Sequence, residues 1–340
     1  MNLGNLMTTA MGVMPHTDVE RALNIALSLD IPYWPQLPHY SYYEDMYVQV
    51  SEHFPGIILD VENKSLRFST EKFYNELPEV LEKFENEEYF DISEKYSVVY
   101  HKFLSLDLTK YAAIRGQLEG PMSFGFYVKD ENDRPILFND EVRTFMLDFM
   151  AKRVNIQLKR LKEKNKNAFM FIDEPGLQFL FSALSGYSDV YAKADMEYFL
   201  SQVNRPRGIH LCGNPDWDFL FGFDMDIVSI DIHTNQKVIP LYGNSIKSFL
   251  ERGGSIVWGI VPTNYDPFIK ENLDSLKKLL KDIWEVVLKS GVDRELLLSK
   301  SLLSPATCCL INKDREKTVE KAFNVLKDLS QILKEEYKLY

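Results

Sequence analysis

Cysteine and positive charge are both scarce in this chain of 340 residues. It has three cysteines, an odd number, with Cys212 remote from the adjacent Cys308 and Cys309, which argues against a disulfide framework. Lysine and arginine total 39 against 50 aspartates and glutamates, so the net charge of -11 makes nucleic acid an unfavourable partner. The cysteines are better candidates for metal or thiol chemistry.

Long apolar runs and common nucleotide-binding motifs are also missing. No run approaches the roughly 20 residues that cross a bilayer, and no basic segment leads into an apolar core near the N-terminus. We therefore expect a cytoplasmic protein without a membrane partner. Neither G-x-G-x-x-G after the first strand nor G-x-x-x-x-G-K-[ST] occurs, which leaves dinucleotide and nucleoside triphosphate folds without local support.

The chain does contain short apolar runs that alternate with amphipathic stretches. Apolar residues on successive positions predict parallel strands covered on both faces, at residues 7–14, 56–61, 112–120, 168–175, 208–213, 226–231, 255–262 and 300–308. Apolar residues at three- and four-residue spacing predict helices between them, as over 140–164 and 272–291.

This alternation predicts an α/β protein with a single (β/α)8 TIM barrel spanning residues 1–340, and two domains are the alternative. The segment 74–102, rich in Glu, Tyr and Phe, is long for one connection. It is expected to form either an excursion over the barrel mouth or extra solvated helix.

Histidine and cysteine lie near the ends of the later predicted strands, where barrels carry their active sites. His210 and Cys212 are two residues apart, so both side chains lie on one face of a strand. Cys308 ends the last strand and can supply a third ligand. Imidazole and thiolate suit zinc, so this pattern predicts a Zn²⁺ site; the alternative is a core histidine with buried cysteines.

Two adjacent acids end the fourth predicted strand. Asp173 and Glu174 precede Pro175 and are candidate catalytic residues, able to bind an amine or to act as general acid and base. The alternative is that they cap the following helix.

The candidate residues fall within motifs that occur in the order TTAMGVMPHTD (8–18), DIPYWPQLP (30–38), EGPMSFG (119–125), IDEPGL (172–177), IHLCGN (209–214), DMDIVSID (224–231) and SPATCCL (304–310). Together they resemble the superfamily of cobalamin-independent methionine synthase and uroporphyrinogen decarboxylase, in its zinc methyltransferase branch. The resemblance covers almost the whole chain. It implies methyl transfer in methionine biosynthesis, from a methylated corrinoid, often held on a separate protein, or from methylfolate, to a small thiol such as homocysteine.

The resemblance also implies roles for particular residues. His210, Cys212 and Cys308 match zinc ligands, and Asp231 stands where the family has a ligating glutamate. Asp173 matches the residue that holds the substrate amino group.

Gly12 and Val13 are expected to line the substrate site, although Val13 replaces a family serine. The shorter Asp231 and the presence of Cys309, where the family has glycine, are further departures. Two alternatives stay open: a non-catalytic partner that binds zinc or a corrinoid, and a lyase like uroporphyrinogen decarboxylase. The arginine motif of such lyases is absent from this sequence.

Overall fold

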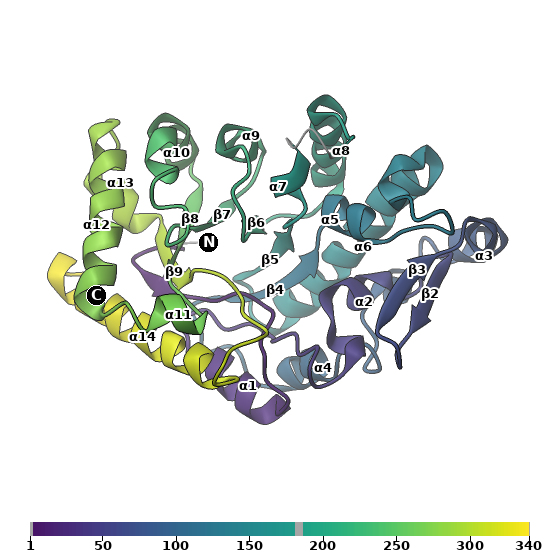
Figure 1. Cartoon of the computed structure of the whole chain (residues 1–340), viewed down its shortest axis with the longest axis horizontal. Helices are drawn as coiled ribbons and strands as arrows, with labels where there is room; N and C mark the ends of the chain where they lie inside the picture. The colour runs from purple at the N-terminus through teal and green to yellow at the C-terminus, as the bar shows by residue number, and fades with distance from the viewer. Residues whose placement is uncertain (1–2, 181–185, 340) are drawn as a thin grey trace.

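Seven parallel strands form one curved sheet at the centre of the molecule (Figure 1). The structure is a computed structural model that describes residues 3–180 and 186–339. In spatial order the strands are β1 (Met7–Thr8), β9 (Ser301–Pro305), β8 (Ser255–Val261), β7 (Ile227–Asp231), β6 (Arg207–Leu211), β5 (Ala168–Asp173) and β4 (Ile114–Glu119). Helices follow the strands around the sheet, so the predicted α/β barrel is confirmed.

An extended segment at residues 31–36 lies between the two edge strands, β1 and β4. On one side the Ile31 N–H donates to the carbonyl of Thr8 at 2.9 Å. On the other side the Arg115 N–H donates to the carbonyl of Pro32 at 3.0 Å. The segment therefore takes the place of an eighth strand, with few bonds because its prolines have no N–H to donate.

The predicted second strand at 56–61 is wrong as a barrel strand. Its residues form β2 (Ile57–Asp60), which pairs antiparallel with β3 (Ser65–Phe68) in a hairpin beside the barrel (Figure 1). An apolar run shows only that a strand is partly buried, not which sheet it joins. Segment 31–36, which takes the place of the eighth strand, was not predicted because its prolines interrupt the apolar run that is typical of a strand.

Helices surround the sheet, and the two longest predictions match closely, as α6 (Asp140–Lys164) and α12 (Leu273–Lys289). The others are α1 (Val19–Leu27), α2 (Met46–Ser51), α3 (Thr70–Glu82), α4 (Val98–Ser105), α5 (Pro121–Tyr127), α7 (Leu177–Leu180), α8 (Asp189–Gln202), α9 (Trp217–Gly222), α10 (Gly243–Glu251), α11 (Tyr265–Phe268), α13 (Arg294–Ser299) and α14 (Lys317–Tyr337). Short 3-10 turns are η1 (Tyr42–Glu44), η2 (Glu87–Phe90), η3 (Ile136–Phe138) and η4 (Ile239–Tyr242). Within the described ranges, no helix is long and apolar enough to cross a membrane.

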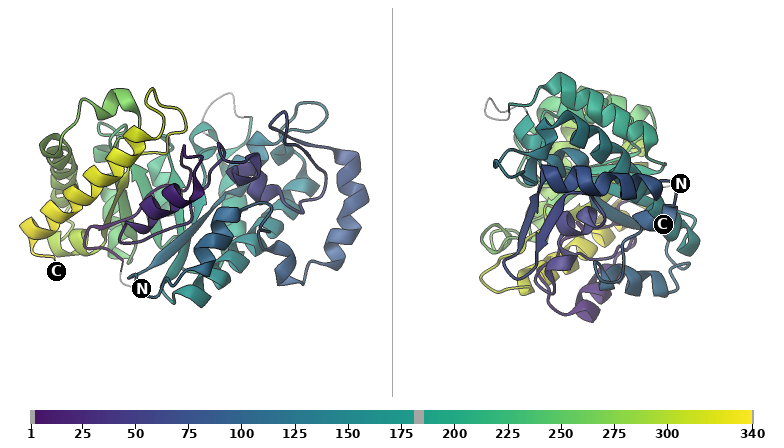
Figure 2. Two further views of the ribbon diagram at one scale, coloured as in Figure 1. Left: turned by 90° about the horizontal axis from the view of Figure 1, so that it is seen from below. Right: turned by 90° about the vertical axis from the view of Figure 1, so that its right-hand side faces the viewer.

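The long connection between segment 31–36 and β4 builds one end of the molecule. Figure 2 shows α3 at the opposite end from the C-terminal helix α14. The segment 74–102 runs from α3 through η2 into α4. It is held to α6 by Arg160, whose Nε donates to Asp91 at 3.0 Å.

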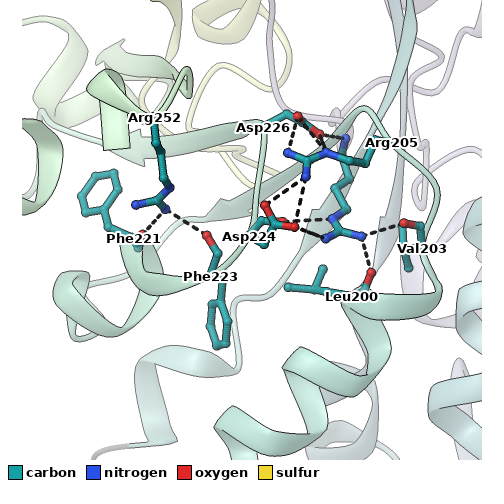
Figure 3. A network of polar contacts seen from close by, with 9 residues as sticks. Leu200, Val203, Arg205, Phe221, Phe223, Asp224, Asp226 and Arg252 are labelled. Carbon is teal, nitrogen blue, oxygen red and sulfur yellow. Dashed lines mark hydrogen bonds and ion pairs between the residues drawn. The ribbon is translucent and has the colours of Figure 1, made fainter. Parts of the chain in front are cut away.

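An arginine–aspartate network ties the start of β6 to the segment before β7 (Figure 3). The Arg205 guanidinium donates to both Asp226 and Asp224 at 2.7 to 3.1 Å. Buried Arg207 donates to the carbonyls of Leu200 and Val203. Polar clusters at the amino-terminal face of a barrel serve stability, so we place the candidate site at the other end.

Candidate functional site

The inner face of the barrel changes from apolar to polar along the strands. Its amino-terminal part is a separate buried cluster made of Leu3, Ile31, Ala113, Phe169, Phe171, Ile227, Val257 and Leu302. Side chains of one strand face recur every second residue. Counted in this way from the apolar cluster toward the carboxyl ends of the strands, the inner face carries a set of polar residues. These are Arg115, Gln117, Glu119, Asp173, His210, Ser229, Asp231 and Ser304, all buried. The polar set lies toward the carboxyl ends of the strands, where barrel enzymes carry their sites.

Three of the predicted metal ligands contact one another there. His210 Nε2 lies 2.7 Å from Cys212 Sγ, and Cys212 is hydrogen-bonded to Cys308. That bond, together with burial, raises the pKa of the Cys212 thiol well above its usual value, and the same bond lowers the pKa of Cys308. The structure therefore joins one imidazole and two thiols from β6 and the turn after β9.

The orientation of His210 is set from the neighbouring strand. Its Nδ1 atom is hydrogen-bonded to Ser229 Oγ at 3.0 Å, and the two residues are directly paired between β6 and β7. This leaves Nε2 to face Cys212. A partner on the second ring nitrogen is the usual arrangement for a histidine that binds a metal.

The fourth predicted ligand, Asp231, and the nearby His233 have other partners. Asp231 accepts a hydrogen bond from the Thr234 N–H at 2.9 Å, so it holds the turn that follows β7. The Nε2 atom of His233 lies 3.1 Å from Glu271 Oε1. Among the described residues, no hydrogen bond joins either side chain to Cys212 or Cys308.

Asp173 is the acid that faces the barrel interior. It is paired with His210 on β6 and with Glu119 on β4. Burial raises its pKa to about 7, and the positive charge of Arg115 opposes that rise. Arg115 is itself fully buried and donates to Thr9 Oγ1 at 3.1 Å and to Gln117 Oε1 at 2.9 Å.

Glu119 is a candidate that the sequence analysis missed. It ends β4 beside Asp173, and burial together with the charges of Glu174 and Asp173 raises its pKa well above the usual value. Among the described residues, neither carboxyl oxygen has a well-formed hydrogen bond, although the Tyr47 hydroxyl lies close enough to interact. Its place at the end of a strand, directly before Gly120 and Pro121, was the available signal.

Glu174 supports a helix. Its carboxyl accepts from the backbone N–H groups of Met122 at 3.0 Å and Ser123 at 2.8 Å, and from Ser123 Oγ at 2.7 Å. These are the first N–H groups of α5, whose N-cap residue Gly120 has no side chain to bind them. A Cβ at Gly120 would lie 2.2 Å from Glu174 Oε1, so the carboxyl occupies that space.

Gly12 and Val13 follow β1 and lie beside this polar set. A Cβ on Gly12 would come within 2.6 Å of the Gln117 side chain. Val13 lines a cavity of about 10 Å³ together with Cys308, which is at the lower limit for one water molecule. On this side of Cys308 there is therefore room for no more than one water molecule.

The donor set fits zinc in its chemistry but not yet in its spacing. Imidazole nitrogen and thiolate sulfur are preferred zinc ligands, at about 2.0 and 2.3 Å from the ion. Two such ligands on a tetrahedral ion are roughly 3.5 Å apart, whereas His210 Nε2 and Cys212 Sγ are 2.7 Å apart. Accordingly, over residues 3–180 and 186–339, no three His, Cys, Asp or Glu side chains are already spaced as a metal site.

Comparisons with known proteins give distant structural likenesses only. No model of a protein family matches the chain, and no curated protein matches it. Among solved structures, the chain is similar to the GH113 beta-mannanase AaManA of Alicyclobacillus acidocaldarius, with 10% identity over 96% of this chain and 98% of that one and a TM-score of 0.36. It is also similar to an endo-1,4-beta-mannanase of Rhizomucor miehei, with 9% identity, coverage of 96% and 95%, and a TM-score of 0.29. Likenesses this distant say nothing about what this chain acts on.

The predicted superfamily is wrong on these comparisons. Neither a family model nor a curated protein supports the likeness to methionine synthase. The predicted methyltransferase activity and its place in methionine biosynthesis rested on that likeness and fall with it, as do the corrinoid-binding and lyase alternatives. The resemblance misled because its motifs are short, and a short motif can serve a structural purpose. In the IDEP motif, for example, the Glu174 carboxylate accepts from the Ser123 N–H and so holds the start of α5.

Proposed function

We propose that the chain is a metal-dependent enzyme whose centre is held by His210, Cys212 and Cys308 at the carboxyl end of the barrel. One observation supports this most directly: Ser229 holds Nδ1 of His210, so that Nε2 faces the Cys212 thiol, which is hydrogen-bonded to the thiol of Cys308. Separation of the imidazole and the first thiol by about 0.8 Å would admit a zinc ion. Bound there, zinc would supply a Lewis acid beside the buried acids.

The neighbouring carboxyls suggest the kind of ligand. Glu119 and Asp173 lie side by side on β4 and β5, both are buried, and each has its pKa raised by burial. A positively charged group placed between them would compensate the cost of ionising two buried acids. We propose that the ligand is small and carries such a group. The partners predicted from the sequence, a thiol substrate and a separate corrinoid protein, are untested, and neither is part of this proposal.

The proposal also concerns the compartment. Metal binding by Cys212 and Cys308 requires both thiols to be reduced, and both are free cysteines. We therefore propose that the protein works in a reducing environment such as the cytoplasm.

Metal content of the purified protein tests this function. Protein loaded with Zn²⁺ under reducing conditions and then desalted should retain about one zinc per chain, measured by emission spectrometry. The C212S and C308S variants should lose it. Cys309 offers a matched control, because its thiol bonds to Asn264 Oδ1 at 2.9 Å outside the three-residue cluster, so C309S should retain the metal. Absence of zinc from the unaltered protein, or equal loss in C309S, would refute the proposal.

A further inference from the structure

Two cavities of useful size lie away from the barrel mouth, and they differ in how their cations are engaged. The larger, of about 730 Å³, is lined by Lys159 and Arg205 among others. Lys159 pairs with Glu87, and the Arg205 guanidinium is held between Asp224 and Asp226 (Figure 3). Lys152 pairs with Glu85, and Lys162, for which the described residues offer no ion pair, donates to the Arg205 carbonyl at 3.0 Å. Each of these cations therefore already has a polar partner.

The second cavity, of about 460 Å³, lies among η1, the β2–β3 hairpin, α3 and η2. Three tyrosines line it: Tyr43, Tyr89 and Tyr96. The Tyr43 and Tyr96 rings meet edge to face with centroids 5.0 Å apart. Its volume is within the range of about 300 to 1,000 Å³ that is typical of small-molecule sites.

One of the lysines that line this cavity, Lys95, has no carboxylate partner among the described residues. Among its lining residues, Glu76 lies 3.5 Å from Lys72. The second acid, Glu79, pairs with Lys83 at 2.6 Å. Lys95 instead lies over aromatic rings, with Nζ 4.9 Å from the centroid of Tyr43, and it forms no ion pair with any residue in the described ranges.

The tyrosine hydroxyls add hydrogen-bond donors in the same place. In the part of the chain that the structure describes, the hydroxyls of Tyr43, Tyr89 and Tyr96 have no protein acceptor. Burial raises the pKa of Tyr96 to about 12, so this hydroxyl stays protonated and able to donate at neutral pH. The cavity thus combines one free ammonium, several free O–H donors and aromatic walls.

We propose that this cavity binds small aromatic carboxylates. The carboxylate would pair with the Lys95 ammonium and accept hydrogen bonds from the tyrosine hydroxyls, since charge-assisted bonds of this kind are the stronger ones. The flat ring would pack against the tyrosine rings. The site is separate from the metal centre proposed above and does not depend on it.

Calorimetric titration with 2-naphthoate tests the site. The unaltered protein should bind one equivalent with a dissociation constant below about 1 mM, a modest affinity for a ligand of this size. The neutral amide 2-naphthamide should bind at least about tenfold more weakly, because it cannot form the ion pair. Saturable binding that does not distinguish acid from amide would overturn the assignment of Lys95.

Variants locate the binding. K95Q should weaken 2-naphthoate binding by about tenfold, and K95R should keep most of it. Lys110 offers a matched control, since its Nζ lies 5.1 Å from the ring centroid of Tyr111 outside this cavity, so K110Q should bind as the unaltered protein does. The C212S variant should also bind equally well, which separates this site from the barrel mouth. A dissociation constant for 2-naphthoate above about 1 mM, or an unchanged affinity in K95Q, would overturn the proposal.

Discussion

At the scale of single residues, the hydroxyl of Ser229 decides which nitrogen of His210 faces the thiols. The S229A change removes the partner of Nδ1 and frees the imidazole to rotate. We expect zinc affinity to fall by about 10- to 100-fold, as when the outer partner of a metal-binding histidine is lost. Competition with a chelating dye would measure this.

Ser255 provides the control for that experiment. It is a buried serine on β8 whose hydroxyl donates to the Leu3 carbonyl at 3.1 Å, at the other end of the barrel. S255A should leave zinc affinity unchanged. An equal loss of affinity in both variants would show that the effect comes from general destabilisation and not from the orientation of His210.

The sequence predicted some residues of this site and not others, for identifiable reasons. His210 and Cys212 were predictable as neighbours because strand side chains alternate. Ser229 was not, because a serine inside the apolar run 226–231 carries no sign of its partner. Glu119 was missed because a single acid at a strand end also suits a turn, and only the structure shows it beside Asp173.

At the scale of secondary-structure elements, the start of α5 depends on Glu174. The E174A change would leave the N–H groups of Met122 and Ser123 buried without an acceptor. We expect the free energy of unfolding to fall by about 2 to 4 kcal/mol, because each lost partner exposes the desolvation penalty of a buried donor. Denaturation by urea would measure this loss.

A second glutamate serves as a control that caps a helix in the same way but is exposed to solvent. Glu131 accepts from the Thr70 N–H at 3.0 Å, at the start of α3, but on the surface. E131A should therefore cost much less stability, since water replaces the carboxylate there. A loss in E174A no larger than in E131A would contradict the structural role of Glu174.

Helices and strands were predictable from the sequence where the spacing of apolar residues fitted only one kind of element. The apolar spacing over 140–164 matches α6 at both ends, and Asn139 caps it by accepting from the Glu141 and Val142 N–H groups. The pattern failed at segment 31–36, where proline removed donors, and at 56–61, where a similar apolar run formed a hairpin. Which strands pair is a long-range property that a local pattern does not contain.

At the scale of the whole molecule, alternation of strands and helices was enough to predict the barrel, because few architectures satisfy it. The long connection between residues 37 and 113 was not predictable to the same degree.

The packing of this connection depends on buried polar contacts between residues far apart in the sequence, such as those of Glu44. The Glu44 carboxyl accepts from Ser97 Oγ at 2.8 Å, from Gln49 Nε2 at 3.0 Å and from the Val99 N–H at 3.2 Å, and so joins η1, α2 and α4.

These buried acids give the molecule a stability that falls as the pH rises. Burial raises the pKa of Glu44 from 4.5 to about 7, and it raises the pKa of Asp173 and Glu174 to about 7 as well. Between these values the folded state binds more protons than the unfolded state, so the free energy of unfolding decreases with pH. We expect metal-free protein to be most stable near pH 5 and to lose stability toward pH 8.

The variant E44Q isolates one contribution to this dependence. Its amide cannot ionise, so the loss of stability between pH 5 and pH 8 should shrink by about 3 kcal/mol, the equivalent of the shift in the Glu44 pKa. Urea denaturation across this range measures the change, and E94Q, at an exposed glutamate, should leave the pH dependence as it is. An unchanged slope in E44Q would mean that the hydrogen bonds from Ser97, Gln49 and Val99 already stabilise the Glu44 carboxylate as well as water does.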